Sequence, residues 1–241
     1  MKNYFTKTEK ILWLTSVTLI TLSFLIFSRD GYLNLAASVL GVTSIMICAK
    51  GNPLGQLMMV FFALIYGYIS YSFSYYGEML TYLGMTGPMA LFSFISWIRN
   101  PFSEKSSEVK VNTISRAEKV FMVFLTAVVT ALFYFILKYF KTANLLPSTL
   151  SVATSFAAVY LTFRRSAYFS LVYASNDIVL IVLWILASMK DISCISVVIC
   201  FTMFLLNDIY AFISWLKMRE RQSEKENENE HQKNYITEQG L

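Results

Sequence analysis

Histidine and cysteine are scarce in this chain of 241 residues, which has one of the former and three of the latter. His231 lies in a polar tail, and Cys48, Cys194 and Cys200 form no CxxC pair. Metal sites and most catalytic centres need such residues in clusters. The sequence therefore excludes a histidine-based catalytic centre or metal cluster inside its apolar segments. We expect no enzymatic activity, no metal and no cofactor.

Charged residues are also few, at 15% of the chain against 56% hydrophobic residues. Soluble domains are usually about 45–50% apolar. The excess lies in long runs almost without charge, and a helix crosses a bilayer with roughly 20 apolar residues. The sequence predicts an all-α integral membrane protein with eight transmembrane helices. These runs are Ile11–Phe27, Tyr32–Ala49, Leu54–Tyr71, Glu78–Ile98, Val120–Leu137, Leu146–Phe163, Ser166–Met189 and Ile192–Leu216.

The net charge of +5 comes from bases that flank these runs, so we read it as a topology signal and not as a nucleic-acid site. Basic residues concentrate on the cytoplasmic side of membrane proteins. With the N-terminus in the cytoplasm, 16 of the 20 Lys and Arg residues fall on the inner side. We therefore expect a multi-pass protein of the cell membrane with both termini in the cytoplasm.

The tetrapeptide FISW occurs twice, at Phe94–Trp97 and Phe212–Trp215, and each copy closes a group of three predicted helices. The single helix Val120–Leu137 between the groups makes both run in the same direction. This predicts a 3+1+3 core of parallel repeats, an architecture associated with transporters, preceded by an extra N-terminal helix. We expect both tryptophans to anchor at the lipid headgroups. The expected segments are 1–31 (N-terminal segment and extra helix), 32–98 (first repeat), 99–119 (solvated cytoplasmic connector), 120–145 (linker helix), 146–216 (second repeat) and 217–241 (disordered tail).

Two carboxylic acids, Asp177 and Asp208, stand well inside the last two predicted spans, where a charge costs at least about 2.5–3.5 kcal/mol. No Lys or Arg in these spans neutralises them, so a cationic ligand, a coupled proton or local hydrogen bonds must. Packing residues that are protonated or hydrogen-bonded are the alternative interpretation. Helical spacing places further polar and aromatic side chains on or beside the same faces. The candidate substrate-binding residues are Tyr173, Asn176, Asp177, Trp184, Asn207, Asp208 and Tyr210.

The stretch KGNPLGQLMMVFFALIYGYISYSFSYYGEMLTYLGMTGPMALFSFISWIRN resembles the first repeat of the PnuC vitamin transporters. RRSAYFSLVYASNDIVLIVLWILAS, followed by LLNDIYAFISWLK, resembles the second, so the resemblance spans about Tyr32 to Lys217. It implies facilitated diffusion of nicotinamide riboside, trapping by a cytosolic kinase, and a site lined by Trp184, Asp177, Asn207 and Tyr210.

The chain departs from the family where a Trp-x-x-Trp pair is common, because Ser170 and Tyr173 stand there. Amide side chains often found near Phe62 and Ala90 are also missing. Thiamine, riboflavin or a deoxynucleoside therefore stay open as substrates, as does proton coupling. The expected partners are a small molecule and the lipid bilayer, with no nucleic acid. Association into a homo-oligomer is left open.

Overall fold

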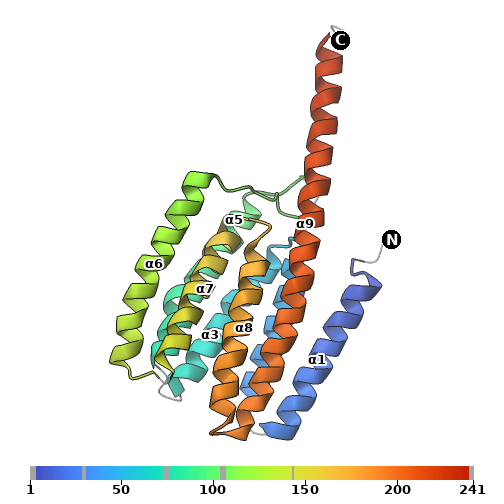
Figure 1. Cartoon of the computed structure of the whole chain (residues 1–241). Coiled ribbons are helices and arrows are strands. Elements are labelled where there is room, and N and C mark those ends of the chain that lie inside the picture. Colours follow the sequence, from blue (N-terminus) through green and yellow to red (C-terminus); the bar gives the residue numbers. More distant parts are fainter. Residues whose placement is uncertain (1–3, 29–30, 73–75, 104–106, 143, 239–241) are drawn as a thin grey trace.

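The computed structural model describes residues 4–28, 31–72, 76–103, 107–142 and 144–238, and most of them are helical. Figure 1 shows one bundle with α1 (Lys7–Phe27) at one edge and α6 (Arg116–Tyr139) at the other. Within the described residues, seven helices are long and apolar enough to cross a membrane. The second predicted run forms α2 (Tyr32–Cys48), a shorter apolar helix of 17 residues. The predicted all-helical class is confirmed.

The other predicted spans form helices that begin within a few residues of the expected bounds, and all but the last also end there; the fourth has one interruption. Pro88 has no N–H, and directly before it the helix widens into a π turn in which the Gly87 N–H donates to the Tyr82 carbonyl. The fourth predicted span is therefore three consecutive segments. The remaining elements are α3 (Leu54–Ser72), α4 (Tyr76–Thr81), the π-helix η1 (Tyr82–Thr86), α5 (Gly87–Ile98), α7 (Leu145–Phe163), α8 (Phe169–Ser188), the 3-10 helix η2 (Ile192–Cys194) and α9 (Ile195–Glu238).

The bundle has two ends, which we name by the chain segments found there. The connector end holds the α2–α3 turn, the connector between α5 and α6, and the α7–α8 turn. The turn end holds the α1–α2, α6–α7 and α8–η2 turns. The third helix of each predicted repeat packs on the first helix of the other, since α5 contacts α7 and α9 contacts α2. The extra helix α1 packs on α9 and α2.

The predicted disorder of the tail is wrong for the described residues, because α9 continues without a break to Glu238 and projects beyond the bundle (Figure 1). The low apolar content of this segment suggested disorder, but Glu, Lys, Arg and Gln are strong helix formers. A membrane-embedded helix directly before them also removes the cost of nucleation. Gln222, near the start of the projection, is buried against the connector.

The connector is not the solvated linker that the sequence suggests. Val109 is fully buried, and its N–H donates to the Gly51 carbonyl at 2.9 Å. The Asn112 N–H donates to the Arg165 carbonyl, also at 2.9 Å. The connector therefore crosses the connector end of the bundle and ties the α2–α3 turn to the α7–α8 turn.

The two tryptophans of the FISW tetrapeptides do not lie at the bundle surface, so their predicted role as headgroup anchors is wrong. Trp97 and Trp215 are both 0% exposed, and their ring centroids lie 5.2 Å apart. Phe169 packs edge-on against both rings. Hydropathy and position along a helix cannot reveal that two distant tryptophans meet in the interior.

Candidate substrate cavity

A cavity of about 360 Å³ lies between the two groups of helices. Its lining reaches the exposed Asp191 at the turn end and Cys48 and Phe169 near the connector end. Ligand sites in proteins are commonly 300–1,000 Å³ and combine apolar walls with a few polar groups. This cavity fits that description: polar groups come from both groups of helices, and its two buried acids come from α8 and α9.

One wall of the cavity carries the two predicted intramembrane acids. Asp177 on α8 and Asp208 on α9 are each 4% exposed, and both line the cavity as neighbours. The Oδ2 atom of Asp177 is buried and has no hydrogen-bond partner. Because an unpartnered buried oxygen is costly, it is suited to accept a bond from a ligand. Tyr173 lines the cavity one turn from Asp177.

Asn176 lies beside the acids with its amide group oriented by α7. Its Oδ1 accepts hydrogen bonds from Thr154 Oγ1 at 2.7 Å, Ser155 Oγ at 3.1 Å and Ser151 Oγ at 3.3 Å. Three hydroxyl groups of α7 therefore hold the Asn176 side chain in place. Sequence reasoning did not select these hydroxyl residues. The spacing of Ser148, Ser151 and Ser155 along one face of α7 is the signal that marks them.

Aromatic rings from α3 and η1 also line the cavity. Tyr66 and Tyr82 lie 5.2 Å apart between ring centroids, and Phe62 lies 4.7 Å from Tyr66. Trp184 on α8 adds a further indole to the lining. Aromatic faces attract cations and stack on flat rings. The cavity therefore combines carboxylic acids with aromatic rings, and the rings come from several helices, among them α3, η1, α8 and α9.

The mouth of the cavity at the turn end carries a third acid. The Asp191 carboxylate accepts a hydrogen bond from the Ser193 N–H at 2.9 Å and caps the short helix η2. This bond to the main chain lowers the pKa of Asp191. The group is therefore ionised at neutral pH and gives the mouth a negative charge, which attracts cations.

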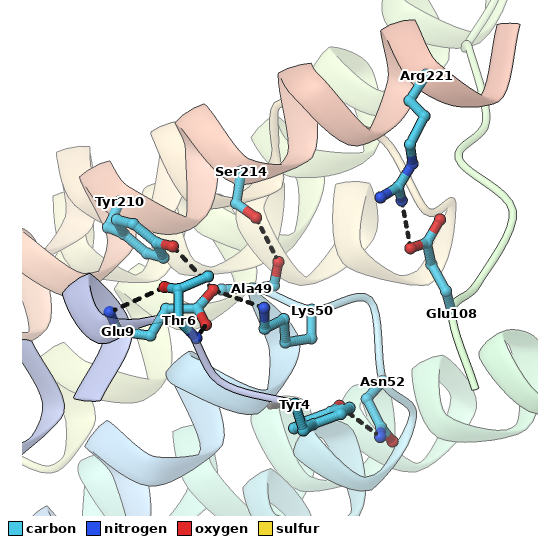
Figure 2. Close-up of polar contacts among 10 residues, drawn as sticks. All are labelled: Tyr4, Thr6, Glu9, Ala49, Lys50, Asn52, Glu108, Tyr210, Ser214 and Arg221. Carbon is cyan, nitrogen blue, oxygen red and sulfur yellow. Dashed lines mark hydrogen bonds and ion pairs between the residues drawn. The ribbon is translucent and has the colours of Figure 1, made fainter. Parts of the chain in front are cut away.

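Two of the seven predicted site residues do not line the cavity. Asn207 donates to Ser16 Oγ at 2.8 Å and to the Met203 carbonyl at 2.7 Å. The Tyr210 hydroxyl donates to Glu9 Oε1 at 2.8 Å, as Figure 2 shows. Both side chains lie on the face of α9 that meets α1. The structure thus brings Tyr173, Asn176, Asp177, Trp184 and Asp208 together and leaves Asn207 and Tyr210 outside.

The apolar helices indicate a multi-pass membrane protein, and the family match identifies it as a membrane transporter. Residues 31–217 match the family described as "Nicotinamide mononucleotide transporter". The chain belongs to this family of PnuC transporters. The match begins after α1 and ends at Lys217, so α1 and the projecting part of α9 lie outside the residues that the family model matches.

Individual relatives agree with this membership. The chain is 25% identical over 202 residues to a protein from Neisseria mucosa named "Nicotinamide riboside transporter PnuC", with 82% of this chain and 77% of the relative covered. It is 21% identical over 216 residues to a protein of the same name from Haemophilus influenzae, covering 89% and 92% of the two chains. A solved structure titled "Crystal structure of the Vitamin B3 transporter PnuC" shares the fold, with a TM-score of 0.76, 24% identity, and coverage of 90% and 94%.

Proposed function

We propose that this chain carries nicotinamide riboside, a precursor of NAD, across the cell membrane by facilitated diffusion. The observation that carries the proposal is the cavity, whose lining combines Asp177 and Asp208 with aromatic rings. Nicotinamide riboside contains a flat pyridinium cation, which stacks on aromatic rings and pairs with a carboxylate. Two curated relatives bear the name of this substrate.

The binding residues in this proposal are Tyr173, Asn176, Asp177, Trp184 and Asp208, all of which line the cavity. Asp177 supplies the charge opposite the pyridinium, since its Oδ2 atom lacks a partner. Asn176 is oriented to donate its amide N–H groups to the ribose hydroxyls. Net uptake requires that a cytosolic kinase phosphorylates the product, because facilitated diffusion alone equalises the concentrations on the two sides.

The topology in this proposal has the connector end in the cytoplasm and both termini on that side. Its support is the distribution of the bases, 16 of 20 of which fall on the inner side. The core consists of two parallel repeats, α2–α5 and α7–α9, joined by α6. The reciprocal packing of α5 on α7 and of α9 on α2 supports this arrangement.

A transport assay with the purified chain in liposomes tests the proposal. We expect labelled nicotinamide riboside to equilibrate across the membrane without an ion gradient, and unlabelled substrate inside to accelerate the entry of label. Uptake of thiamine, riboflavin or a deoxynucleoside in place of nicotinamide riboside would reassign the substrate. Failure of all four compounds to enter would contradict the proposed function.

Proton coupling is a second candidate mechanism, and the contact between Asp177 and Asp208 is the observation that favours it. Two carboxyl groups in contact cannot both ionise easily, so such a pair is able to exchange a proton. Accumulation above equilibrium in response to a pH gradient would establish coupling. Equal uptake with and without that gradient would leave facilitated diffusion.

A further inference from the structure

The two copies of Ser-Trp in the FISW tetrapeptides make the same contacts in opposite directions. Trp97 Nε1 donates to the Thr162 carbonyl at 2.9 Å, and Trp215 Nε1 donates to the Cys48 carbonyl at 2.8 Å. Thr162 and Cys48 belong to the last turns of α7 and α2. Each tryptophan therefore joins the third helix of one group to the first helix of the other.

The serines repeat this pattern one residue earlier. Ser96 Oγ donates to the Phe163 carbonyl at 2.9 Å, and Ser214 Oγ donates to the Ala49 carbonyl at 2.8 Å. The second of these bonds is drawn in Figure 2. Four side chains thus form four hydrogen bonds to the carboxyl ends of α2 and α7, two from each side of the interface.

These contacts lie between the cavity and the connector end of the bundle. Phe169 lines the cavity and packs against both tryptophan rings, with centroids 6.1 Å from Trp97 and 4.8 Å from Trp215. Cys48 also lines the cavity, and its carbonyl is the acceptor of the Trp215 bond. The Ser-Trp pairs therefore separate the cavity from the connector end, whereas the turn end is lined by the exposed Asp191.

The connector covers the same contacts from outside. Its bonds from Val109 and Asn112 reach the turns that follow α2 and α7, so it spans the interface that the tryptophans close. The projecting part of α9 holds it, because Gln222 Oε1 accepts from the Val111 N–H at 2.8 Å and Gln222 Nε2 donates to the Val109 carbonyl at 3.0 Å. Arg221 pairs with Glu108 of the connector (Figure 2).

The tryptophan bonds are also suited to break and form again. The Cys48 carbonyl accepts a second bond from the Gly51 N–H at 2.8 Å, and the Thr162 carbonyl accepts one from the Arg165 N–H at 2.9 Å. Both acceptors therefore keep a partner when the indoles leave. The indole N–H itself finds water or headgroups at a membrane interface, where tryptophan is common. Separation of the two groups of helices here would leave no buried carbonyl of these two residues without a bond.

We propose that Ser96-Trp97 and Ser214-Trp215 form a tryptophan latch that closes the connector end of the cavity and opens when the substrate leaves or enters there. The proposal rests on the transport function proposed above. Transport requires that the cavity opens to each side in turn, and this end is the one the structure holds shut. Opening breaks all four bonds and exposes Cys48, whose thiol lies at the cavity floor.

Sided labelling of the native cysteines tests the latch without any substrate. The full chain is treated in inside-out and right-side-out membrane vesicles with a membrane-impermeant maleimide, and labelled peptides are quantified by mass spectrometry. Cys194 lies at the turn end of the cavity and identifies the vesicles that present that end. Cys200 is buried in a core cluster with Ile20 and reports unfolding.

The test variant is the double substitution Trp97→Phe and Trp215→Phe, which keeps the rings and removes both indole N–H donors. From the connector side we expect Cys48 to react about tenfold faster than in the unmodified chain, with Cys200 unchanged. The matched control is Trp13→Phe, which removes an indole bond to Thr43 Oγ1 at 3.0 Å, away from the cavity. It should leave Cys48 unreactive.

A milder variant, Ser96→Ala with Ser214→Ala, removes the other two bonds without touching the aromatic rings and should give a smaller increase. Unchanged labelling of Cys48 in both double variants would overturn the latch. An equal increase in the labelling of Cys200 would also overturn it, because the four bonds would then stabilise the whole fold and not one end of the cavity. Faster labelling of Cys48 in a chain that does not carry nicotinamide riboside would retain the latch and reject the substrate. Normal uptake of nicotinamide riboside with unchanged labelling of Cys48 would retain the substrate and reject the latch.

Discussion

The two groups of helices, α2–α5 and α7–α9, make matching contacts at the connector end and differ around the cavity. Counted from the turns after α2 and α7, Ala63 occupies in the first group the position that Asp177 occupies in the second. Phe62 in the first group likewise corresponds in position to Asn176 in the second, so one group has an aromatic ring where the other has an amide. The two groups are alike in their contacts at the connector end and unlike in the lining of the cavity, where Asp177 and Asp208 both belong to the second group. This difference is what we expect of the proposed repeats if they close in the same way and bind an asymmetric ligand.

The largest expected effect concerns the acid that only the second group carries. We expect Asp177→Asn to weaken the binding of nicotinamide riboside by about 10–100-fold. The substitution removes the charge that attracts the pyridinium, which has no N–H. It also weakens a hydrogen bond from a ribose hydroxyl or the carboxamide, and such bonds to a charged group contribute about 1.5–3 kcal/mol. Isothermal titration of the purified chain and uptake in liposomes measure the effect. Asp191→Asn, the same change at the exposed mouth, is the control and should have a much smaller effect. Undiminished affinity in Asp177→Asn would remove the charge argument.

The helices were predictable from the sequence, since long uncharged runs have few other solutions. The cavity face of α8 was also predictable, because Tyr173, Asp177 and Trp184 recur at helical spacing in a helix without a base. The side of α9 that lines the cavity was not predictable. Asn207 and Asp208 are neighbours that point about 100° apart, and only the position of α1 decides which of them meets the cavity. Sequence spacing contains no information on that packing.

The projecting part of α9 and the connector could not be predicted for a related reason. Their polar composition is typical of solvated segments, yet each is ordered by the other through Gln222 and Glu108. Such mutual ordering depends on contacts between segments far apart in the chain. The reciprocal bonds of Trp97 and Trp215 were hidden in the same way, although the repeated tetrapeptide marked the right residues.

The helix α1 packs on one helix of each group, α2 and α9, and breaking contacts that it makes outside the cavity separates stability from binding. Glu9 is 2% exposed, pairs with Lys50 at 2.8 Å and accepts the bond from Tyr210. We expect Glu9→Ala to lower the free energy of unfolding by about 1–3 kcal/mol, because it leaves these donors unpaired.

Thermal unfolding in detergent measures this loss, with the exposed Lys10→Ala as the control. The affinity for substrate should be unchanged, since Glu9 and Tyr210 lie outside the cavity. A loss of affinity without a loss of stability would instead assign Tyr210 to the site, as the sequence suggested.

A smaller effect is expected at the matched turns after α2 and α7, where Gly51 and Arg165 have φ angles of 66° and 57°. A left-handed conformation strains a residue with a Cβ by roughly 1–2 kcal/mol. Arg165 has this strain in the folded chain, whereas Gly51, without a Cβ, does not. We therefore expect Gly51→Ala to lower the free energy of unfolding by about 1 kcal/mol, because the lower conformational entropy of alanine in the unfolded chain offsets part of the strain. Gly51→Asn should cost less, because asparagine tolerates this region. Equal melting temperatures for Gly51→Ala and the unmodified chain would show that the turn relaxes.

The smallest expected effect tests the matched half of the comparison itself. Trp97→Phe and Trp215→Phe each remove one indole hydrogen bond of nearly equal length and keep a buried ring, so each should cost about 1 kcal/mol of stability. Their melting temperatures should fall by the same amount, measured by thermal unfolding in one detergent. Trp184→Phe, within the unmatched cavity, should instead change affinity more than stability. Unequal losses at Trp97 and Trp215 would mean that one side of the interface bears most of the closure, and the opening motion would then pivot on the stronger side.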